Sequence, residues 1–414
     1  MTISLPEGSA LRSPDFLFGV ATSSFQIEGD ADCRLDSIWD TFCRVPGAIS
    51  DGSDGRVACD HVALWRDDVE LMADLGLDAY RFSISWPRVM DRQGRLNEKG
   101  LDFYRRLIEK LNLSGIRPFA TLYHWDLPQH LDDTGGWLNR DTAYRFADYA
   151  DQVSRALGDG VASWATLNEP FCSAEFGYGT GKHAPGHSDP AWARQSAHHL
   201  LLAHGLAMPA LSTNCPQAMN GIVLNFSPCY PETDSRADRD AAEHADQSLN
   251  QWYLLPVIAG TYPELLQRLP PEQHPDIGDG DMEIISHPLD FLGVNYYFRN
   301  VCRYGADGAW EQVVQEQAPR TDFDWEIYPN GLSELLIDYD RRYDLPPVYI
   351  TENGAAMRDT LIGGRVHDPE RTRYFEQHLI ELDRAMRAGV DVRGYFAWSL
   401  MDNFEWAEGY TKRF

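Results

Sequence analysis

The chain has 414 residues, of which 43% are hydrophobic and 24% are charged, a balance typical of a globular protein with a large core. Its 63 acidic residues outnumber the 36 Lys and Arg residues, and the formal net charge is −27. This excess disfavours nucleic acid, which requires a basic surface, and it argues mildly against anionic substrates and acidic membranes.

Short apolar, β-branched or aromatic runs recur along the chain and predict eight strands. Each run is apolar nearly throughout, as expected of parallel strands that are buried on both faces. In chain order the predicted strands span residues 16–21, 79–84, 117–123, 163–167, 221–226, 291–296, 347–351 and 392–399.

Amphipathic helices separate several of these strands. Apolar residues three or four apart predict a helix over 62–72, which Gly76 ends, and similar patterns over 146–156 and 375–386 also precede a glycine. Strand–helix alternation repeated about eight times favours the α/β class and a (β/α)₈ TIM barrel. Because no linker or composition break divides the chain, we expect one catalytic domain over residues 1–414.

The cysteines, the N-terminal residues and the longest apolar stretches indicate the cellular location to expect. The seven cysteines are scattered, without a CxxC pair or a metal-like Cys/His spacing, which favours reduced thiols in a cytosolic protein. The sequence begins without a basic, apolar signal peptide, and no stretch approaches the roughly 18 apolar residues of a membrane span. We therefore expect a cytoplasmic protein.

Four histidines could suggest a metal site, namely His183, His187 and the His198-His199 pair. They lack further convergent ligands and lie outside the polar strand ends, so we expect solvated or capping histidines. No metal and no other cofactor is implied.

Polar residues gather where the predicted strands end. In a barrel of this kind the carboxyl ends of all strands meet at one rim, where the chemistry takes place. Seven polar ends on one rim therefore predict a pocket. They are Gln26-Ile27-Glu28, Arg81, His124-Trp125-Asp126, Asn168-Glu169, Asn295-Tyr296-Tyr297, Glu352-Asn353 and Glu405-Trp406.

Two of these ends carry a glutamate where a buried strand meets a loop: Glu169 after the fourth strand and Glu352 after the seventh. A carboxylate in that position is partly desolvated and needs a partner or a function. Such a pair could hydrolyse a glycosidic bond, with retention if the carboxyls lie roughly 5–5.5 Å apart and inversion if they lie farther apart. A rim ion pair and an enolising barrel are the alternatives, although the latter usually shows a Lys base or a metal cluster.

Eight sequence segments resemble glycoside hydrolase family 1, the β-glucosidase family, and together they cover nearly the whole chain. The most specific are TLNEP at 166–170 and YITENG at 349–354. The others are FLFGVATSSFQIEG (16–29), AYRFSISWPRV (79–89), TLYHWDLPQHL (121–131), FLGVNYY (291–297), WEIYPNGL (325–332) and WSLMDNFEWAEGYTKRF (398–414).

The resemblance implies a retaining β-glycosidase that hydrolyses terminal β-D-glucosides, and also β-galactosides or β-fucosides. Glu352 would be the nucleophile that forms a covalent glycosyl-enzyme intermediate, and Glu169 would be the general acid/base. Asn168 would hold the 2-hydroxyl of the sugar. The substrate would be a small β-glycoside or a short oligosaccharide.

The resemblance also assigns the residues around this pair. Arg81, Asn295 and Tyr297 would orient Glu352 and lower its pKa. Asn295 and Tyr297 would belong to the substrate-binding set as well. The rest of that set would be Gln26, His124, Glu405 and Trp406 at the sugar hydroxyls, Trp398 beneath the sugar, Trp325 beside the aglycone and Phe414 at the pocket rim.

Two positions narrow the substrate within the family. Relatives that act on 6-phosphorylated sugars carry a Ser, with a nearby Lys and Tyr, in place of the Glu405-Trp406 arrangement. Since Glu405 would repel a phosphate, an unphosphorylated sugar is expected. Thioglucoside-specific members have Gln in place of the acid, so Glu169 indicates O-glycosides.

The resemblance breaks off at Phe414, where the family continues into a strand extension and a helix that closes the barrel. We therefore expect a barrel without that final helix and with apolar surface exposed outside the first and eighth strands. An inactive sugar-binding form is the alternative that this departure raises. A transglycosidase, which passes the sugar to an alcohol, is a further alternative within the same chemistry.

Overall fold

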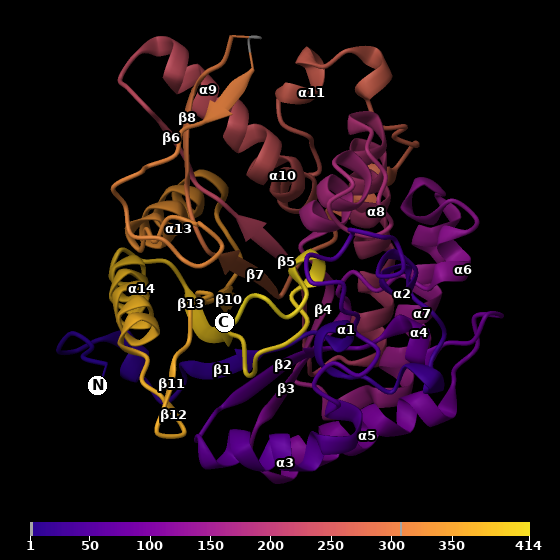
Figure 1. Ribbon diagram of the computed structural model, residues 1–414. Coiled ribbons are helices and arrows are strands. Elements are labelled where there is room, and N and C mark those ends of the chain that lie inside the picture. The colour runs from indigo at the N-terminus through magenta and orange to yellow at the C-terminus, as the bar shows by residue number, and fades with distance from the viewer. Residues whose placement is uncertain (1–2, 307–308) are drawn as a thin grey trace.

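The protein is described by a computed structural model over residues 3–306 and 309–414. Residues 1–2 and 307–308, although part of the predicted domain, lie outside the described residues. Eight parallel strands form a closed barrel in the order β1-β13-β10-β7-β5-β4-β3-β2, with helices around it (Figure 1). The strands are β1 (Leu17–Ala21), β2 (Ala79–Ser83), β3 (Arg117–Tyr123), β4 (Ser163–Asn168), β5 (Met219–Phe226), β7 (Phe291–Tyr296), β10 (Val348–Asn353) and β13 (Val392–Trp398). Every predicted strand is present, and the predicted TIM barrel is confirmed.

Helices connect the barrel strands and cover their outer faces (Figure 1). The longer helices are α3 (His61–Asp74), α5 (Glu98–Leu113), α7 (Asp141–Leu157), α8 (Pro190–Asn214), α9 (Arg236–Asp246), α13 (Asn330–Tyr343) and α14 (Pro369–Arg387). The shorter ones are α1 (Ser24–Ile27), α2 (Ile38–Phe42), α4 (Trp86–Val89), α6 (Gln129–Asp132), α10 (Trp252–Ala259), α11 (Leu265–Arg268) and α12 (Asp281–Ile285). The three helices predicted from apolar spacing correspond to α3, α7 and α14. No helix in the part of the chain that the structure describes has both the length and the apolar character to cross a bilayer.

Apolar side chains are buried on both faces of the barrel strands. Inside the barrel Phe119 contacts Tyr349 and Phe396, with ring centroids 5.6 and 5.0 Å apart. The opposite faces of the strands pack against the helices in a second, larger cluster. This two-sided burial is the physical reason why the strand segments are apolar almost throughout rather than alternating. The filled interior leaves the rim at the strands' carboxyl ends as the place for a pocket.

Two small sheets lie outside the barrel and were not predicted. One contains β6 (Cys229–Pro231), β8 (Asn300–Tyr304) and β9 (Trp310–Gln312), and the other pairs β11 (Leu361–Ile362) with β12 (Arg365–Val366). Their strands have two to five residues, too short for a periodic pattern to be read from sequence.

The outside of β1 and β13 is largely covered. Val20 and Tyr395 are buried in the outer core, whereas Phe18 and Ala397 are only half-buried. Helix α14 lies beside this part of the barrel (Figure 1). The apolar exposure expected here is therefore limited among the residues that the structure describes.

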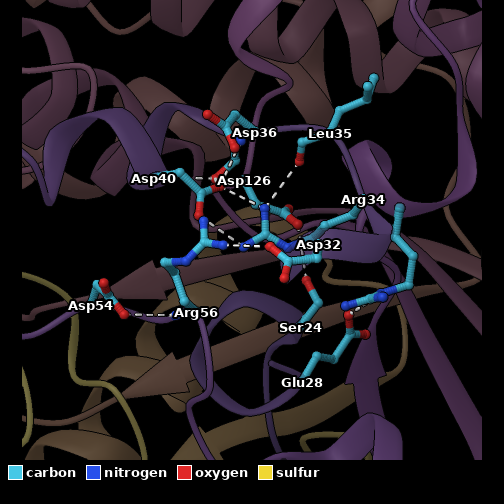
Figure 2. A network of polar contacts seen from close by, with 12 residues as sticks. Ser24, Glu28, Asp32, Arg34, Leu35, Asp36, Asp40, Asp54, Arg56 and Asp126 are labelled. Carbon is cyan, nitrogen blue, oxygen red and sulfur yellow. Dashed lines mark hydrogen bonds and ion pairs between the residues drawn. The ribbon is translucent and has the colours of Figure 1, made fainter. Parts of the chain in front are cut away.

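Buried ion pairs fix the segment between β1 and α3 (Figure 2). Arg34 donates to both carboxylate oxygens of Asp40, at 2.5 and 2.9 Å, and their side chains are 4% and 2% exposed. Arg88 donates to Glu28 at 2.8 Å, again in a buried setting. Since Gln26 lies in the same segment, these pairs hold one wall of the rim in place.

Candidate active site

A cavity of about 360 Å³ opens at the carboxyl ends of the barrel strands. Ten of the predicted site residues line it: His124, Glu169, Asn295, Tyr297, Trp325, Glu352, Trp398, Glu405, Trp406 and Phe414. Gln26, Arg81 and Asn168 stand directly behind this lining, each in hydrogen-bond contact with a lining residue. The structure thus brings together every residue to which the family resemblance assigned a role, whereas Glu28, Asp126 and Asn353, also at the predicted rim, do not line the cavity.

Glu352, at the end of β10, is 4% exposed and is held by two donors. The Arg81 guanidinium donates to its Oε1 at 2.6 Å, and the Tyr297 hydroxyl donates to its Oε2 at 2.7 Å. Burial raises the pKa of Glu352, while the positive charge of Arg81 and the Tyr297 hydrogen bond oppose that rise. Both oxygens are therefore fixed by groups that favour the ionised form.

Glu169 follows β4, is 6% exposed and has no cation of its own among its hydrogen-bond partners in the described residues. Asn295 Nδ2 donates to Oε1 at 2.6 Å, and the Cys172 thiol lies 3.0 Å from Oε2. Burial, reinforced by the negative charge of Glu352, raises the pKa of Glu169 to about 7. This carboxyl is therefore the one that keeps its proton near neutral pH.

Asn168 connects the two carboxyls through its amide. Its Oδ1 accepts from Arg81 at 2.6 Å and from Asn295 at 3.2 Å, which leaves Nδ2 to donate to His124 Nε2 at 3.0 Å. Burial lowers the pKa of His124 well below its usual range, so the ring is neutral. With Nε2 accepting, the proton of that neutral ring resides on Nδ1.

Asn295 has a wider role than the one expected of it. It was predicted to orient Glu352, and its strand position does face Glu352 across the β7–β10 pairing. Its amide also donates to Glu169, while Thr351 donates to its Oδ1 at 2.7 Å. It therefore contributes to the environment of both carboxyls.

The far end of the pocket carries a third buried carboxyl. Gln26 Nε2 donates to Glu405 Oε2 at 3.3 Å and to the Phe404 carbonyl at 3.0 Å. Burial, followed by the charge of Glu352, raises the pKa of Glu405 to about 8. A neutral carboxyl beside an amide gives this end several donors and acceptors for hydroxyl groups.

Aromatic rings form the walls. Trp398 and Trp406 each stack on His124 with centroids 5.9 Å apart. In a second aromatic group Trp325 stacks on Phe323 at 4.5 Å, and Phe414 lies 5.8 Å from Phe323. Flat apolar walls with polar groups at one end suit a sugar, whose ring faces are apolar and whose rim is hydroxylated.

The backbone is unusual at three pocket residues. Trp125, Glu169 and Trp406 have φ angles of 76°, 44° and 48°, in the left-handed region that non-glycine residues seldom adopt. Such conformations cost about 1–3 kcal/mol each and are found where a side chain must be aimed at a site.

Sequence reasoning expected aglycone contacts on the loops around 171–190 and 299–325 but did not name the residues of this second lining group. They come from the segment after β4, from the end of β5 and from the small outer sheet: Phe171, Cys172, Phe176, Lys182, His183, Asn225, Trp310 and Gln312. The first five follow the TLNEP segment closely, and that proximity was the available signal. The sequence contains no such signal for the outer-sheet residues Trp310 and Gln312, because only the tertiary fold brings β9 to the pocket.

Of the four histidines that we expected to be solvated or capping, three are buried, so the expected exposure was wrong for them. His183 is buried among aromatic rings, with centroids 5.3 Å from Trp39 and 5.0 Å from Phe176. His198 and His199 are buried on α8, next to Asp281 at 2.9 Å and to the Trp137 carbonyl at 2.8 Å, respectively. Within residues 3–306 and 309–414, no group of three or more His, Cys, Asp or Glu side chains could hold a metal ion.

The chain resembles known proteins over nearly its whole length. The sequence profile of glycosyl hydrolase family 1 matches residues 10–414. A β-glucosidase of Agrobacterium sp. is 44% identical, over 99% of this chain and 91% of that protein. A bifunctional β-D-glucosidase/β-D-fucosidase of Bifidobacterium breve is 42% identical, over 100% of this chain and 93% of that protein.

A solved structure gives the same result. The Thermotoga maritima family 1 glycoside hydrolase, complexed with a cyclophellitol analogue that mimics a transition state, superposes with a TM-score of 0.94. It is 43% identical, and the match covers 97% of this chain and 92% of that one. Profile, sequence and structure agree with the pocket geometry, and the chain belongs to glycosyl hydrolase family 1.

Proposed function

We propose that this family 1 glycosidase hydrolyses terminal, unphosphorylated β-D-glucosides with retention of configuration. The observation that carries the proposal is the unequal treatment of two carboxyls in one pocket. Glu352 is held by a cation and a phenol, whereas Glu169 has no cationic hydrogen-bond partner among the described residues and a pKa raised to about 7. One group is thus prepared to attack as an anion, and the other to donate a proton.

The first step would form the intermediate. Ionised Glu352 attacks the anomeric carbon while neutral Glu169 gives its proton to the departing oxygen, so that the glycosidic bond breaks as the ester forms. Asn168, fixed by Arg81 and His124, would hold the sugar's 2-hydroxyl beside the nucleophile. That contact strengthens in the transition state and lowers the barrier.

The second step would return the enzyme to its starting form. Once Glu352 is a neutral ester, its charge no longer raises the pKa of Glu169, and Glu169 becomes a competent base. It takes a proton from an incoming water, whose oxygen attacks the anomeric carbon and releases Glu352. Two inversions give net retention.

The glycone end supports a neutral sugar. Glu405, Gln26, His124 and Trp406 present hydrogen-bonding groups there. A phosphate placed against Glu405 would be repelled by ionised Glu352, whose charge already acts on Glu405. The wall formed by Trp325, Phe323 and Phe414 would contact the aglycone. The related β-glucosidase/β-fucosidase supports tolerance of β-fucosides. The scattered cysteines support a cytoplasmic location.

An aryl β-D-glucoside assay of the 414-residue chain and of Glu352→Gln tests the proposal. We expect turnover by the parent and a loss of several orders of magnitude in the variant, with both proteins folded by circular dichroism. The matching 6-phosphoglucoside should be hydrolysed at least about 100-fold less efficiently, because of the added like charge. A folded parent that binds glucose but shows no turnover would instead identify a sugar-binding protein.

A further inference from the structure

We propose that Cys172 is a positioning residue for the general acid/base, holding the Oε2 atom of Glu169 through a thiol hydrogen bond. This inference rests on the proposed function, because it assigns a partner to the group that would transfer the proton. Cys172 touches a carboxyl that the proposed mechanism uses in both steps.

A single turn fixes the geometry. Glu169 adopts the left-handed conformation, and the chain then enters the π-helical segment Cys172–Gly179. The backbone N–H of Cys172 donates to the Glu169 carbonyl at 2.9 Å, and its Sγ lies 3.0 Å from Oε2. Thiol and carboxyl thus belong to one four-residue turn, whose backbone hydrogen bond keeps the two residues side by side.

The thiol is suited to donate rather than to react. Cys172 is buried, and burial together with the neighbouring Glu169 charge raises its pKa well above the usual range. It therefore remains S–H at any pH where the enzyme would work, a weak donor beside a carboxylate. That hydrogen bond favours the ionised form of Glu169 and opposes the effect of burial.

The two oxygens of Glu169 consequently have different partners. Asn295 always donates to Oε1, since its own Oδ1 is occupied by Thr351. When Glu169 is neutral its proton must then lie on Oε2, where sulfur can serve as a weak acceptor. When Glu169 is ionised the thiol can turn to donate. A thiol, which can weakly donate or weakly accept a hydrogen bond, suits a carboxyl that gives up a proton and regains it in each cycle.

Other charged or titratable groups around Glu169 must be held constant in any test. They are Arg81 on β2, Glu352 on β10, Tyr297 after β7, Lys182 after the π-helical segment and Glu405 after β13. Substituting Cys172 changes none of them. An effect on the titration of Glu169 can therefore be assigned to the thiol.

The test compares pH profiles of kcat/KM for the parent, Cys172→Ala and Cys172→Ser on an alkyl β-D-glucoside, whose leaving group needs the acid. In Cys172→Ala we expect the alkaline limb to move up by about half a pH unit, because the ionised form loses a donor. In Cys172→Ser, a stronger donor, the limb should stay in place or move down. The acidic limb, which reports on Glu352, should not move.

Cys215→Ser is the matched control, since this buried thiol lies after α8, near the Ser154 and Gly158 carbonyls and remote from the pocket. Its profile should equal that of the parent. An alkaline limb unchanged in Cys172→Ala would overturn the proposal. If Cys172→Ala fails to fold, the proposal is overturned by an alkaline limb that moves to higher pH in Cys172→Ser.

The proposed function is tested separately by Glu169→Gln with 2,4-dinitrophenyl β-D-glucoside, whose leaving group needs no acid. Loss of the alkaline limb there, without any effect of the Cys172 substitutions, leaves the function standing and removes only the role of the thiol. An alkaline limb that persists in Glu169→Gln contradicts the assignment of the acid/base itself.

Discussion

The two carboxyls that we propose to be catalytic lie in the same pocket and are both buried, yet their surroundings differ. Glu352 receives a charged guanidinium and a phenol, both of which stabilise its anion. Glu169 receives an amide and a thiol, and the neighbouring charge that affects its pKa most, that of Glu352, is of its own sign. Burial alone would raise both pKa values, so the partners decide which group is the nucleophile and which is the acid.

Asn168 connects the hydrogen-bond partners of the two carboxyls. It accepts from the arginine that serves Glu352 and from the amide that serves Glu169. A displacement of this one side chain would loosen the partners of both carboxyls. Separate roles thus depend on a shared hydrogen-bond network.

The largest effect is expected from Glu352→Ala. Removing the nucleophile should lower kcat on an aryl β-D-glucoside by at least about 10⁴-fold. Azide can occupy the vacated space and attack from that side, so rescued turnover should yield the α-glucosyl azide, detected by NMR. A β-product from this variant would contradict the assignment of Glu352.

The azide product of Glu169→Ala should have the opposite anomeric configuration to that of Glu352→Ala. Substrates whose leaving group needs a proton should lose about 10²–10⁴-fold in kcat/KM, whereas 2,4-dinitrophenyl β-D-glucoside should lose far less. Azide would here attack the intermediate on Glu352 and give the β-glucosyl azide. Equal losses for good and poor leaving groups would argue against a proton-donating role.

Tyr297→Phe should have a smaller effect, on the other limb of the pH profile. The hydroxyl donates to ionised Glu352, so its removal raises the pKa of that carboxyl, by about one unit. Because only the ionised nucleophile reacts, the acidic limb of kcat/KM should move to higher pH, with about a tenfold loss at the optimum. The alkaline limb, set by Glu169 near pH 7 in the parent, should stay in place. A fixed acidic limb would show that Tyr297 does not act on Glu352.

The smallest effect on chemistry is expected from Arg34→Met, in the network of Figure 2. It leaves Asp40 buried without its cation, which should lower the free energy of unfolding by about 3 kcal/mol. Activity at 25 °C should change less than about threefold, because the pair supports the pocket wall and contacts no reacting group. Urea unfolding with parallel kinetics measures both quantities. A large loss of kcat in a stably folded variant would place this network closer to the chemistry.

Local sequence patterns and the family resemblance were enough to predict the barrel and most of the residues that line its pocket. Runs such as 291–296 are apolar nearly throughout because both of their faces are buried, and that requirement is visible without coordinates. The glutamates were identifiable for the same reason, since a carboxylate at the end of a buried strand is costly unless it has a function. The family resemblance then supplied the roles of Asn168, Arg81 and Tyr297.

Some features of the pocket could be seen only in the tertiary structure, because they depend on contacts between distant parts of the chain. Trp310 and Gln312 reach the pocket only because β9 folds back beside β8, and His183 is buried only because Trp39 and Phe176 meet around it. The thiol of Cys172 was one of seven scattered cysteines until the left-handed turn at Glu169 brought it to the carboxyl. The contacts of Trp310, Gln312 and His183 depend on distances between segments, which no local pattern of residues encodes, whereas the position of Cys172 depends on the backbone conformation of one turn.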